Sequence, residues 1–140
     1  RRRVVVAIDG PDAAGKTTLA DRLAADFGAA RICADDFLFP VRPPDVDGYY
    51  RRAFDYDSLR RTVTDTAGDV VVDGVFMLRP ELRDLWDFTI LLDAPFELRL
   101  ARAKARGERD VDRRYRERYQ PAWELHVREC DPAAVADLVF

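Results

Sequence analysis

The chain has 140 residues, of which 48% are hydrophobic and 35% are charged, and its formal net charge is −3 at pH 7. This length allows one compact domain with one hydrophobic core and is too short for two. A mildly acidic chain lacks the broad basic surface of a general nucleic-acid binder, and no segment approaches the ~20 apolar residues of a membrane span. The sequence therefore predicts a single domain over residues 1–140, with neither nucleic acid nor membrane as a partner.

The cysteine content favours a reducing compartment. The chain has two cysteines, Cys33 and Cys130, which lie far apart and lack the spacing of zinc ligands or of a disulfide framework. The apolar run at residues 4–8 is too short for the core of a signal peptide. We therefore expect a cytoplasmic protein, and the oligomeric state stays open, a homo-oligomer included.

Strand-like and helix-like patterns alternate along the chain. Residues 4–8 form an uninterrupted apolar run typical of a parallel strand that is covered on both faces. Residues 16–27 follow as a predicted helix, with Leu19, Leu23 and Phe27 on one face and Gly28 at the position of a C-terminal cap. Further strands are predicted at residues 31–34, 70–72, 88–92 and 137–140, further helices near residues 56–64, 80–86 and 95–106, and a loop at residues 40–48. This alternation predicts a three-layer α/β/α sandwich around a mainly parallel five-stranded sheet, with ligands at the carboxyl ends of the strands.

Residues 10–17 read GPDAAGKT and match the pattern GxxxxGK[ST] of a phosphate-binding loop (P-loop) between a strand and a helix. In such a loop, backbone N–H groups and the helix N-terminus face the phosphates of a nucleotide. Lys16 is expected to reach the β- and γ-phosphates and the Thr17 hydroxyl to bind Mg²⁺, which predicts ATP and Mg²⁺ as cofactors. The base of the phosphate donor stays open between ATP and GTP. The residues expected to bind the nucleotide are Gly10, Asp12, Ala13, Ala14, Gly15, Lys16, Thr17, Thr18 and, from the arginine-rich stretch described below, Arg109.

Carboxylates follow two of the predicted strands on the side expected to hold the phosphates. Asp35 and Asp36 come after the second strand, and Asp73 closes the third. Phosphoryl transfer to an alcohol uses one carboxylate to orient the hydroxyl and accept its proton, and another to hold the metal directly or through water. Capping of turns is the alternative role for Asp36 and Asp73. The layout is typical of a kinase, with Thr17, Asp35 and Asp73 as the candidate metal site.

An arginine-rich stretch occupies residues 99–118, where nine basic residues accompany four acidic ones. Arg99, Arg102 and Arg106 share one helical face, and Gly107 ends the helix before Arg109. This pattern predicts a lid at about residues 104–113 that closes over the phosphates and excludes water, with Arg102 and Arg106 as catalytic cations. A solvated helix face is the alternative.

A regularly spaced aromatic pattern lies towards the end of the chain. Tyr115, Tyr119, Trp123 and Val127 recur every four residues, which predicts a helix packed into the core without a chemical role. His126 has no partner motif, so we expect it to be structural or exposed.

Together these residues resemble the uridine kinase family and its actinobacterial relatives. The match covers residues 10–18, the pair Asp35 and Phe37, residues 54–55, Asp73 and residues 99–109, and residues 72–103 are its most specific part. The resemblance implies a P-loop nucleoside-kinase fold in which the second strand neighbours the P-loop strand. It implies that Asp35 is the catalytic base, that Phe37 and Asp55 contact the acceptor, the latter through its ribose hydroxyls, and that Asp73 replaces a glutamate near the metal.

The segment between Arg60 and Asp73 departs from this family, because it has only about a dozen residues where uridine kinases carry an insertion that contacts the base. The resemblance implies an ATP-dependent kinase acting on the 5′-hydroxyl of a nucleoside such as uridine or cytidine, but the sequence does not support a particular base. Three alternatives stay open: a kinase for another alcohol such as pantothenate or a sugar, a nucleotide-binding regulatory protein with weak catalysis, and a nucleic-acid binder that uses the arginine-rich stretch. Asp35 separates the first two, since a regulator needs no carboxylate beside an acceptor.

Overall fold

A five-stranded sheet forms the centre of the molecule, which is described over residues 2–140 by a computed structural model. The strands are β1 (Val5–Asp9), β2 (Ala30–Cys33), β3 (Val70–Gly74), β4 (Phe88–Leu91) and β5 (Leu138–Val139). Their order is β2-β3-β1-β4-β5, and every pairing is parallel. The expectation that the second strand neighbours the P-loop strand is wrong, because β3 lies between β1 and β2. The composition explains this order: β3 is buried along its whole length, whereas β2 carries Arg31, which suits the edge of the sheet.

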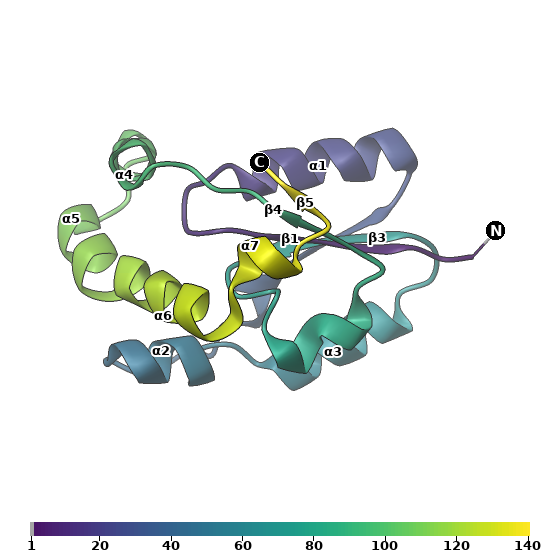
Figure 1. The fold of residues 1–140 in the computed structure, drawn as a ribbon, viewed down its shortest axis with the longest axis horizontal. Helices are drawn as coiled ribbons and strands as arrows, with labels where there is room; N and C mark the ends of the chain where they lie inside the picture. Colours follow the sequence, from purple (N-terminus) through teal and green to yellow (C-terminus); the bar gives the residue numbers. More distant parts are fainter. Residues whose placement is uncertain (1) are drawn as a thin grey trace.

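Helices cover both faces of the sheet. They are α1 (Lys16–Phe27), α2 (Val46–Arg52), α3 (Tyr56–Asp65), α4 (Phe96–Ala105), α5 (Val111–Arg114), α6 (Gln120–Cys130) and α7 (Pro132–Val135). Two 3₁₀ turns, η1 (Ala34–Phe37) and η2 (Pro80–Leu85), and a π-helical turn, η3 (Tyr115–Tyr119), complete the chain. Figure 1 shows α1 on one side of the sheet and α2, α3 and α6 on the other, so the predicted α/β/α sandwich is confirmed. Within residues 2–140, no helix combines the length and the apolar composition that a membrane span requires.

Local signals explain two differences from the expected elements. The predicted loop at residues 40–48 ends early because the Asp45 carboxylate caps α2 and accepts a hydrogen bond from the Gly48 N–H at 2.9 Å. In α1, the buried apolar positions are Ala20 and Ala24, while Phe27 is 71% exposed, since small side chains let the helix lie close to the sheet. Gly28 ends α1 in the left-handed conformation, as its position predicts.

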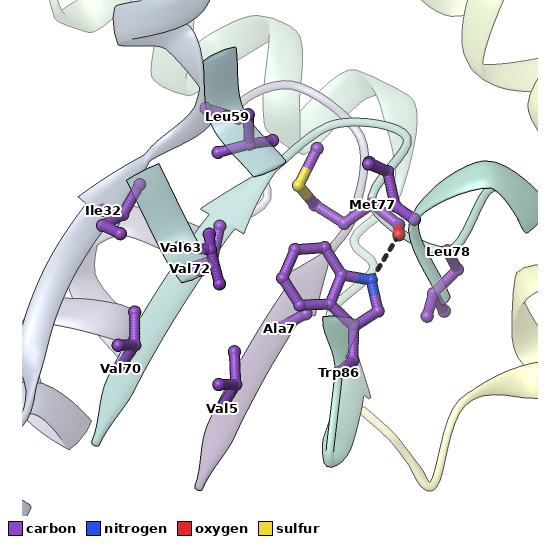
Figure 2. Close-up of a cluster of buried hydrophobic side chains, with 12 residues drawn as sticks. Val5, Ala7, Ile32, Leu59, Val63, Val70, Val72, Met77, Leu78 and Trp86 are labelled. Atoms are coloured by element: carbon purple, nitrogen blue, oxygen red, sulfur yellow. Dashed lines mark hydrogen bonds between the residues drawn. The ribbon is translucent and has the colours of Figure 1, made fainter. Parts of the chain in front are cut away.

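The largest core cluster fills the space between the sheet and α3 (Figure 2). Strands alternate their side chains between the two faces of a sheet. Val5 and Ala7 of β1 therefore pack on the α3 side together with Val70 and Val72 of β3. On this side, the indole N–H of Trp86 donates a hydrogen bond to the carbonyl oxygen of Met77 at 2.8 Å.

The same alternation decides where the carboxylates at the strand ends point. Ile8 and Val71 pack against α1. One residue later in β1, Asp9 points to the opposite side and contacts His126 of α6. Two residues after Val71, Asp73 points to the α1 side and contacts Thr17. The two strand-end carboxylates, Asp9 and Asp73, thus contact helices in opposite layers of the sandwich.

Candidate active site

The loop between β1 and α1 has the conformation that its glycines require. A Cβ atom on Gly10 would lie 2.2 Å from the carbonyl oxygen of Leu92, so no larger residue fits there. Ala13 and Gly15 have φ values of 62° and 102°, in the left-handed region. Such alternation of backbone conformation turns successive N–H groups into a concave, anion-binding surface at the start of a helix. The sequence pattern and the backbone therefore agree on a P-loop.

A cavity of about 400 Å³ opens beside this loop at the carboxyl ends of the strands. It gathers most of the predicted site residues: Asp12, Ala13, Gly15, Lys16, Thr17, Thr18, Asp35, Asp73 and Arg106. The other lining residues are Cys33, Leu38, Tyr49, Gly74, Val75, Glu108, Tyr115 and Tyr119. Of the remaining predicted residues, Gly10 and Ala14 shape the loop from beneath, and Phe37, Asp55, Arg102 and Arg109 lie outside the lining.

Lys16 places a buried cation against the loop. Its side chain is only 9% exposed, and Nζ donates a hydrogen bond to the carbonyl oxygen of Pro11 at 2.6 Å. The ammonium group also acts on the carboxylates of Asp12 and Asp35, whose pKa values it lowers against the effect of burial. The positive charge of Lys16 thus lies between the P-loop and the carboxylates that line the cavity.

Thr17 and Asp73 offer a partial magnesium site. The Thr17 hydroxyl donates a hydrogen bond to Oδ2 of Asp73 at 3.2 Å, and Asp73 is 2% exposed. Oδ1 of Asp73 lies 2.6 Å from Nη1 of Arg31, but among the described residues it accepts no well-oriented hydrogen bond. Residues 2–140 contain no cluster of three or more acidic, cysteine or histidine side chains that would enclose a metal. A hydroxyl and one or two carboxylates fit Mg²⁺, which usually completes its coordination with water and phosphate oxygens.

Asp35 is the carboxylate of the acidic pair that faces the cavity. It lies in η1, directly after β2, whereas Asp36 does not line the cavity. Loss of water around the carboxylate raises the pKa of Asp35; Lys16 opposes this effect, and Asp73 and Asp36 add to it. A carboxylate with a raised pKa is a better proton acceptor than an ordinary aspartate.

Three tyrosines, Tyr49, Tyr115 and Tyr119, form the side of the cavity that we call the tyrosine wall. Tyr49 comes from α2, and the other two come from η3. Their ring centroids lie 5.5 Å apart for Tyr49 and Tyr119 and 5.3 Å apart for Tyr115 and Tyr119. Burial, and after it the charge of Asp12, raises the pKa of all three hydroxyls, so they stay protonated and can donate as well as accept hydrogen bonds.

The tyrosine wall is the part of the site that sequence analysis missed. The four-residue spacing correctly predicted a packed segment, but Tyr115 and Tyr119 also face the cavity, and Val127 is 42% exposed. The π turn shifts the helical register at these tyrosines. One feature of the sequence could have indicated this role: tyrosine, unlike phenylalanine, carries a hydroxyl group that needs a polar environment where the ring packs.

Asp12 was expected to serve the nucleotide through the loop backbone, and its side chain adds a further carboxylate to the cavity. Burial raises the pKa of Asp12, the charges of Lys16 and Arg99 lower it, and the charge of Asp35 raises it further. The charge of Asp12 in turn raises the pKa of all three hydroxyls of the tyrosine wall.

Asp55 and Phe37 occupy structural positions. The Asp55 carboxylate caps α3 and accepts hydrogen bonds from the Ser58 N–H at 3.1 Å and the Ser58 hydroxyl at 2.7 Å, which lower its pKa. Phe37 packs against the core cluster on the α3 side of the sheet. The structure therefore does not bring either side chain to the cavity.

The arginines of α4 divide into a buried anchor and exposed cations. Arg99 is 3% exposed and donates hydrogen bonds to the carbonyl oxygens of Ala94 and Asp12 and to the side chain of Gln120. It therefore fastens α4 to the P-loop and to the start of α6. Arg102 donates a hydrogen bond to the carbonyl oxygen of Ala13 at 3.2 Å.

A second cavity, of about 670 Å³, also borders the P-loop and shares Ala13, Gly15 and Thr18 with the first. Arg22, Arg102 and Arg106 line it together with Gly15 and Thr18 of the loop. Arg106 lines both cavities and forms an ion pair with Glu108 at 2.5 Å, whereas Arg109 lines neither. The P-loop is thus flanked by an acidic, hydroxyl-rich cavity and by a cavity with three arginines.

One protein family and several solved structures are similar to this chain. The family model described as AAA domain matches residues 6–123. A possible uridine kinase from Bacillus stearothermophilus superposes with a TM-score of 0.71 at 22% identity, covering 100% of this chain and 89% of that one. A gluconokinase from Sinorhizobium meliloti gives 0.64 at 16% identity (99% and 82% covered), and a shikimate kinase from Acinetobacter baumannii gives 0.59 at 19% identity (99% and 83% covered). No curated protein matches the sequence.

Proposed function

Because this chain belongs to the AAA domain family and shares its fold with several small-molecule kinases, we propose that it is an ATP-dependent kinase that phosphorylates a hydroxyl group of a small molecule. One observation carries the proposal: the P-loop lysine and the Asp35 carboxylate, from the turn that follows β2, line the same cavity. A nucleotide sensor needs the first of these groups but not the second. Phosphoryl transfer to an alcohol needs both.

The proposed reaction assigns a role to each group around the cavity. The P-loop backbone and Lys16 bind the phosphates of ATP, and Thr17 and Asp73, with Asp35 nearby, hold Mg²⁺, which supplies charge neutralisation at the phosphates when bound. Asp35 orients the acceptor hydroxyl and takes its proton as the acceptor oxygen bonds to the γ-phosphorus. The bond from the γ-phosphorus to the bridging oxygen of ADP breaks in the same transfer.

The arginine-rich stretch serves the phosphate side in this proposal. Arg102 and Arg106 lie beside the P-loop, at the cavity that is available to the nucleoside part of ATP. Arg109 belongs to the proposed lid over residues 104–113, where Gly107 has a φ value of 76° and supplies a flexible joint. Closure of this segment brings cations over the transferring phosphate and keeps water away from it.

The acceptor of the proposed kinase is a nucleoside, phosphorylated at its 5′-hydroxyl. The resemblance to uridine kinases supports this choice, as does the fold shared with the possible uridine kinase. The lining of the first cavity agrees, because Asp12, Asp35 and the tyrosine wall offer hydrogen-bond partners for hydroxyl groups. The resemblance to uridine kinases implies that Phe37 and Asp55 also contact the acceptor. For such a contact, the Asp55 carboxylate has to replace its hydrogen bonds from Ser58 by hydrogen bonds from the acceptor.

A sugar without an acidic group is the second candidate acceptor, favoured by the same lining. Shikimate, gluconate and pantothenate carry a carboxylate, which needs a cation to bind it. The cations that line the first cavity are Lys16 and Arg106, and both are required for the phosphates in the proposed reaction. The charge of the cavity therefore favours a neutral acceptor.

The test is ADP release measured with ATP or GTP over a panel of ribonucleosides, deoxynucleosides, neutral sugars, pantothenate, shikimate and gluconate. We expect release that depends on a nucleoside, with a phosphorylated product of the matching mass. Hydrolysis without dependence on any acceptor would favour the regulatory alternative. Turnover with a carboxylate acceptor alone would contradict the charge argument.

A further inference from the structure

Asp9, the last residue of β1, carries a fully buried carboxylate that the proposed reaction does not use. Its exposure is 0%, and it directly precedes Gly10, the first residue of the P-loop. Oδ1 accepts a hydrogen bond from the Gly10 N–H at 2.8 Å, and Oδ2 accepts one from the Leu78 N–H at 3.1 Å. Oδ2 also lies 2.9 Å from Nε2 of His126. The buried Asp9 carboxylate thus has three polar partners, of which two are backbone N–H groups.

His126 continues this network towards α2. It is 0% exposed, and Nδ1 lies 2.9 Å from the hydroxyl of Tyr50, which in turn lies 3.3 Å from Sγ of Cys130. In the tautomer whose Nε2 donates to Asp9, Nδ1 of His126 accepts a hydrogen bond from the Tyr50 hydroxyl. Burial and the contact with Cys130 raise the pKa of Tyr50, which keeps its proton available for this bond. Each polar side chain of this network (Asp9, His126, Tyr50 and Cys130) thus has a hydrogen-bond partner.

The network lies next to the elements that carry the tyrosine wall. Tyr50 is the neighbour of Tyr49 in α2, and His126 lies in α6, which follows η3 with Tyr115 and Tyr119. The two supporting elements are in contact, because the rings of Tyr49 and Tyr119 are 5.5 Å apart. One buried chain of hydrogen bonds therefore joins the start of the P-loop to α2, which carries Tyr49, and to α6, which directly follows η3.

Phe76 packs between these parts and explains why they keep one arrangement. Its ring centroid lies 4.8 Å from that of Tyr50, 5.3 Å from that of His126 and 6.2 Å from that of Tyr49. Phe76 has a φ value of 66°, an unfavourable conformation for a large side chain, which persists only where the surroundings hold it. Fully satisfied buried networks make a region rigid, and here the network connects the start of the P-loop with the helix that carries Tyr49.

We infer that Asp9, His126 and Tyr50 form a positioning network that holds the tyrosine wall at a set distance from the P-loop and thereby determines how well the acceptor binds. None of the three lines the cavity, so they act through Gly10 and Tyr49 and not on the substrate itself. The inference rests on the proposed function only for its kinetic consequence. Its structural consequence, that a change at Tyr50 reaches the P-loop, holds for any reaction.

The test uses Tyr50→Phe, which removes one hydroxyl and leaves the pair of Asp9 and His126 in place. Tyr56→Phe is the matched control: its hydroxyl accepts a hydrogen bond from Arg79 at 2.5 Å, but Tyr56 belongs neither to the network nor to the cavity lining. Replacement of His126 itself is avoided, because it would remove the only side-chain partner of the buried Asp9 carboxylate among the described residues.

The first measurement is hydrogen exchange of the backbone amides, which needs no substrate. We expect the Gly10 amide to exchange about 3–10-fold faster in Tyr50→Phe than in the wild type, as loss of about one hydrogen bond would allow, and to be unchanged in Tyr56→Phe. Equal exchange at Gly10 in the wild type and Tyr50→Phe would overturn the inference, whether or not the protein proves to be a kinase.

The second measurement compares the KM values for the acceptor and for ATP. With the best acceptor of the panel, Tyr50→Phe should raise the acceptor KM about 3–10-fold, leave the ATP KM within about twofold, and leave kcat nearly unchanged. A variant that is less stable but keeps the wild-type acceptor KM would show a structural role alone and would also overturn the inference. Absence of acceptor-dependent turnover in the wild type would instead contradict the proposed function, and the exchange measurement then decides the inference by itself.

Discussion

The P-loop and the tyrosine wall face the same cavity, but they are assembled from very different lengths of chain. The P-loop comes from consecutive residues, and Gly10 and Gly15 determine its shape locally. The tyrosine wall joins Tyr49 of α2 to Tyr115 and Tyr119 of η3, which lie far along the chain. In the proposed function, phosphate binding is therefore a local property of the chain, while acceptor binding depends on how distant helices pack. Five predictions test this contrast.

Replacing Lys16 with alanine should have the largest effect. Because the buried ammonium group serves the phosphates in binding and in transfer, we expect Lys16→Ala to weaken ATP binding and to lower turnover by at least about 10³-fold. Arg60→Ala, which removes an exposed arginine paired with Asp84 outside the cavity lining, is the matched control and should keep the ATP binding and turnover of the wild type. Calorimetric ATP titration and ADP release measure the two effects. Wild-type turnover in Lys16→Ala would contradict the P-loop assignment.

Asp35→Asn should reduce kcat by about 10²–10⁴-fold with little change in ATP affinity, because asparagine keeps the size of the side chain but cannot accept the proton. Asp36→Asn is the control, since Asp36 does not line the cavity. Both variants are to be compared at saturating ATP with the best acceptor. Loss of activity in Asp36→Asn alone would show that the roles of the two carboxylates are exchanged, and full activity in both would exclude the proposed mechanism.

Tyr49→Phe tests the acceptor side directly. Loss of one uncharged hydrogen bond should raise the acceptor KM by about 2–10-fold and leave the ATP KM unchanged. The aromatic contacts of Tyr49 with Phe54 and Phe76 remain in the variant, so its stability should be close to that of the wild type. Steady-state kinetics with each substrate varied in turn provide the measurement. An equal rise of both KM values would show that Tyr49 contributes to the binding of both substrates. It would contradict the assignment of the tyrosine wall to the acceptor alone.

Asp55→Ala should lower the melting temperature by about 3–5 °C, because its carboxylate caps α3. Asp45→Ala removes the equivalent cap of α2 and should have a similar effect. Thermal unfolding followed by circular dichroism compares the two variants. A raised KM for ribonucleosides in Asp55→Ala, absent in Asp45→Ala, would add the acceptor role that the family resemblance implies.

The smallest effect concerns the stability of Asp35→Asn. Because the folded-state pKa of Asp35 is raised above 3.8, the stability that this carboxyl contributes is fully present below pH 3.8 and is lost as the pH rises through the folded value. At pH 7 the ionised group therefore opposes folding, and Asp35→Asn should melt slightly above the wild type. The difference should shrink as the pH falls towards 4, while wild-type turnover declines over the same interval. A lower melting temperature of Asp35→Asn at pH 7 would contradict this.

Several parts of the fold and of the site were readable from the sequence because neighbouring residues determine them. The apolar runs marked the strands of a parallel sheet, and Gly28 marked the end of α1. The GxxxxGKT pattern located the P-loop with Lys16 and Thr17. Where a prediction failed, a competing local interaction or the packing of the sheet was responsible: Asp45 began a helix inside a predicted loop, and β3 took the place beside β1 that was expected for β2.

The sequence by itself determined the cradle for phosphates, since glycine conformation and strand periodicity act over a few residues. Only the tertiary structure decided what faces that cradle. The turn of η3 brings Tyr115 and Tyr119 to the cavity, and Asp55 is placed outside its lining. His126, which has no partner in its own stretch of sequence, meets Asp9 and Tyr50 only when α6 and α2 pack beside the end of β1. Contacts between such distant residues depend on the summed packing of the whole domain, and no short pattern encodes them.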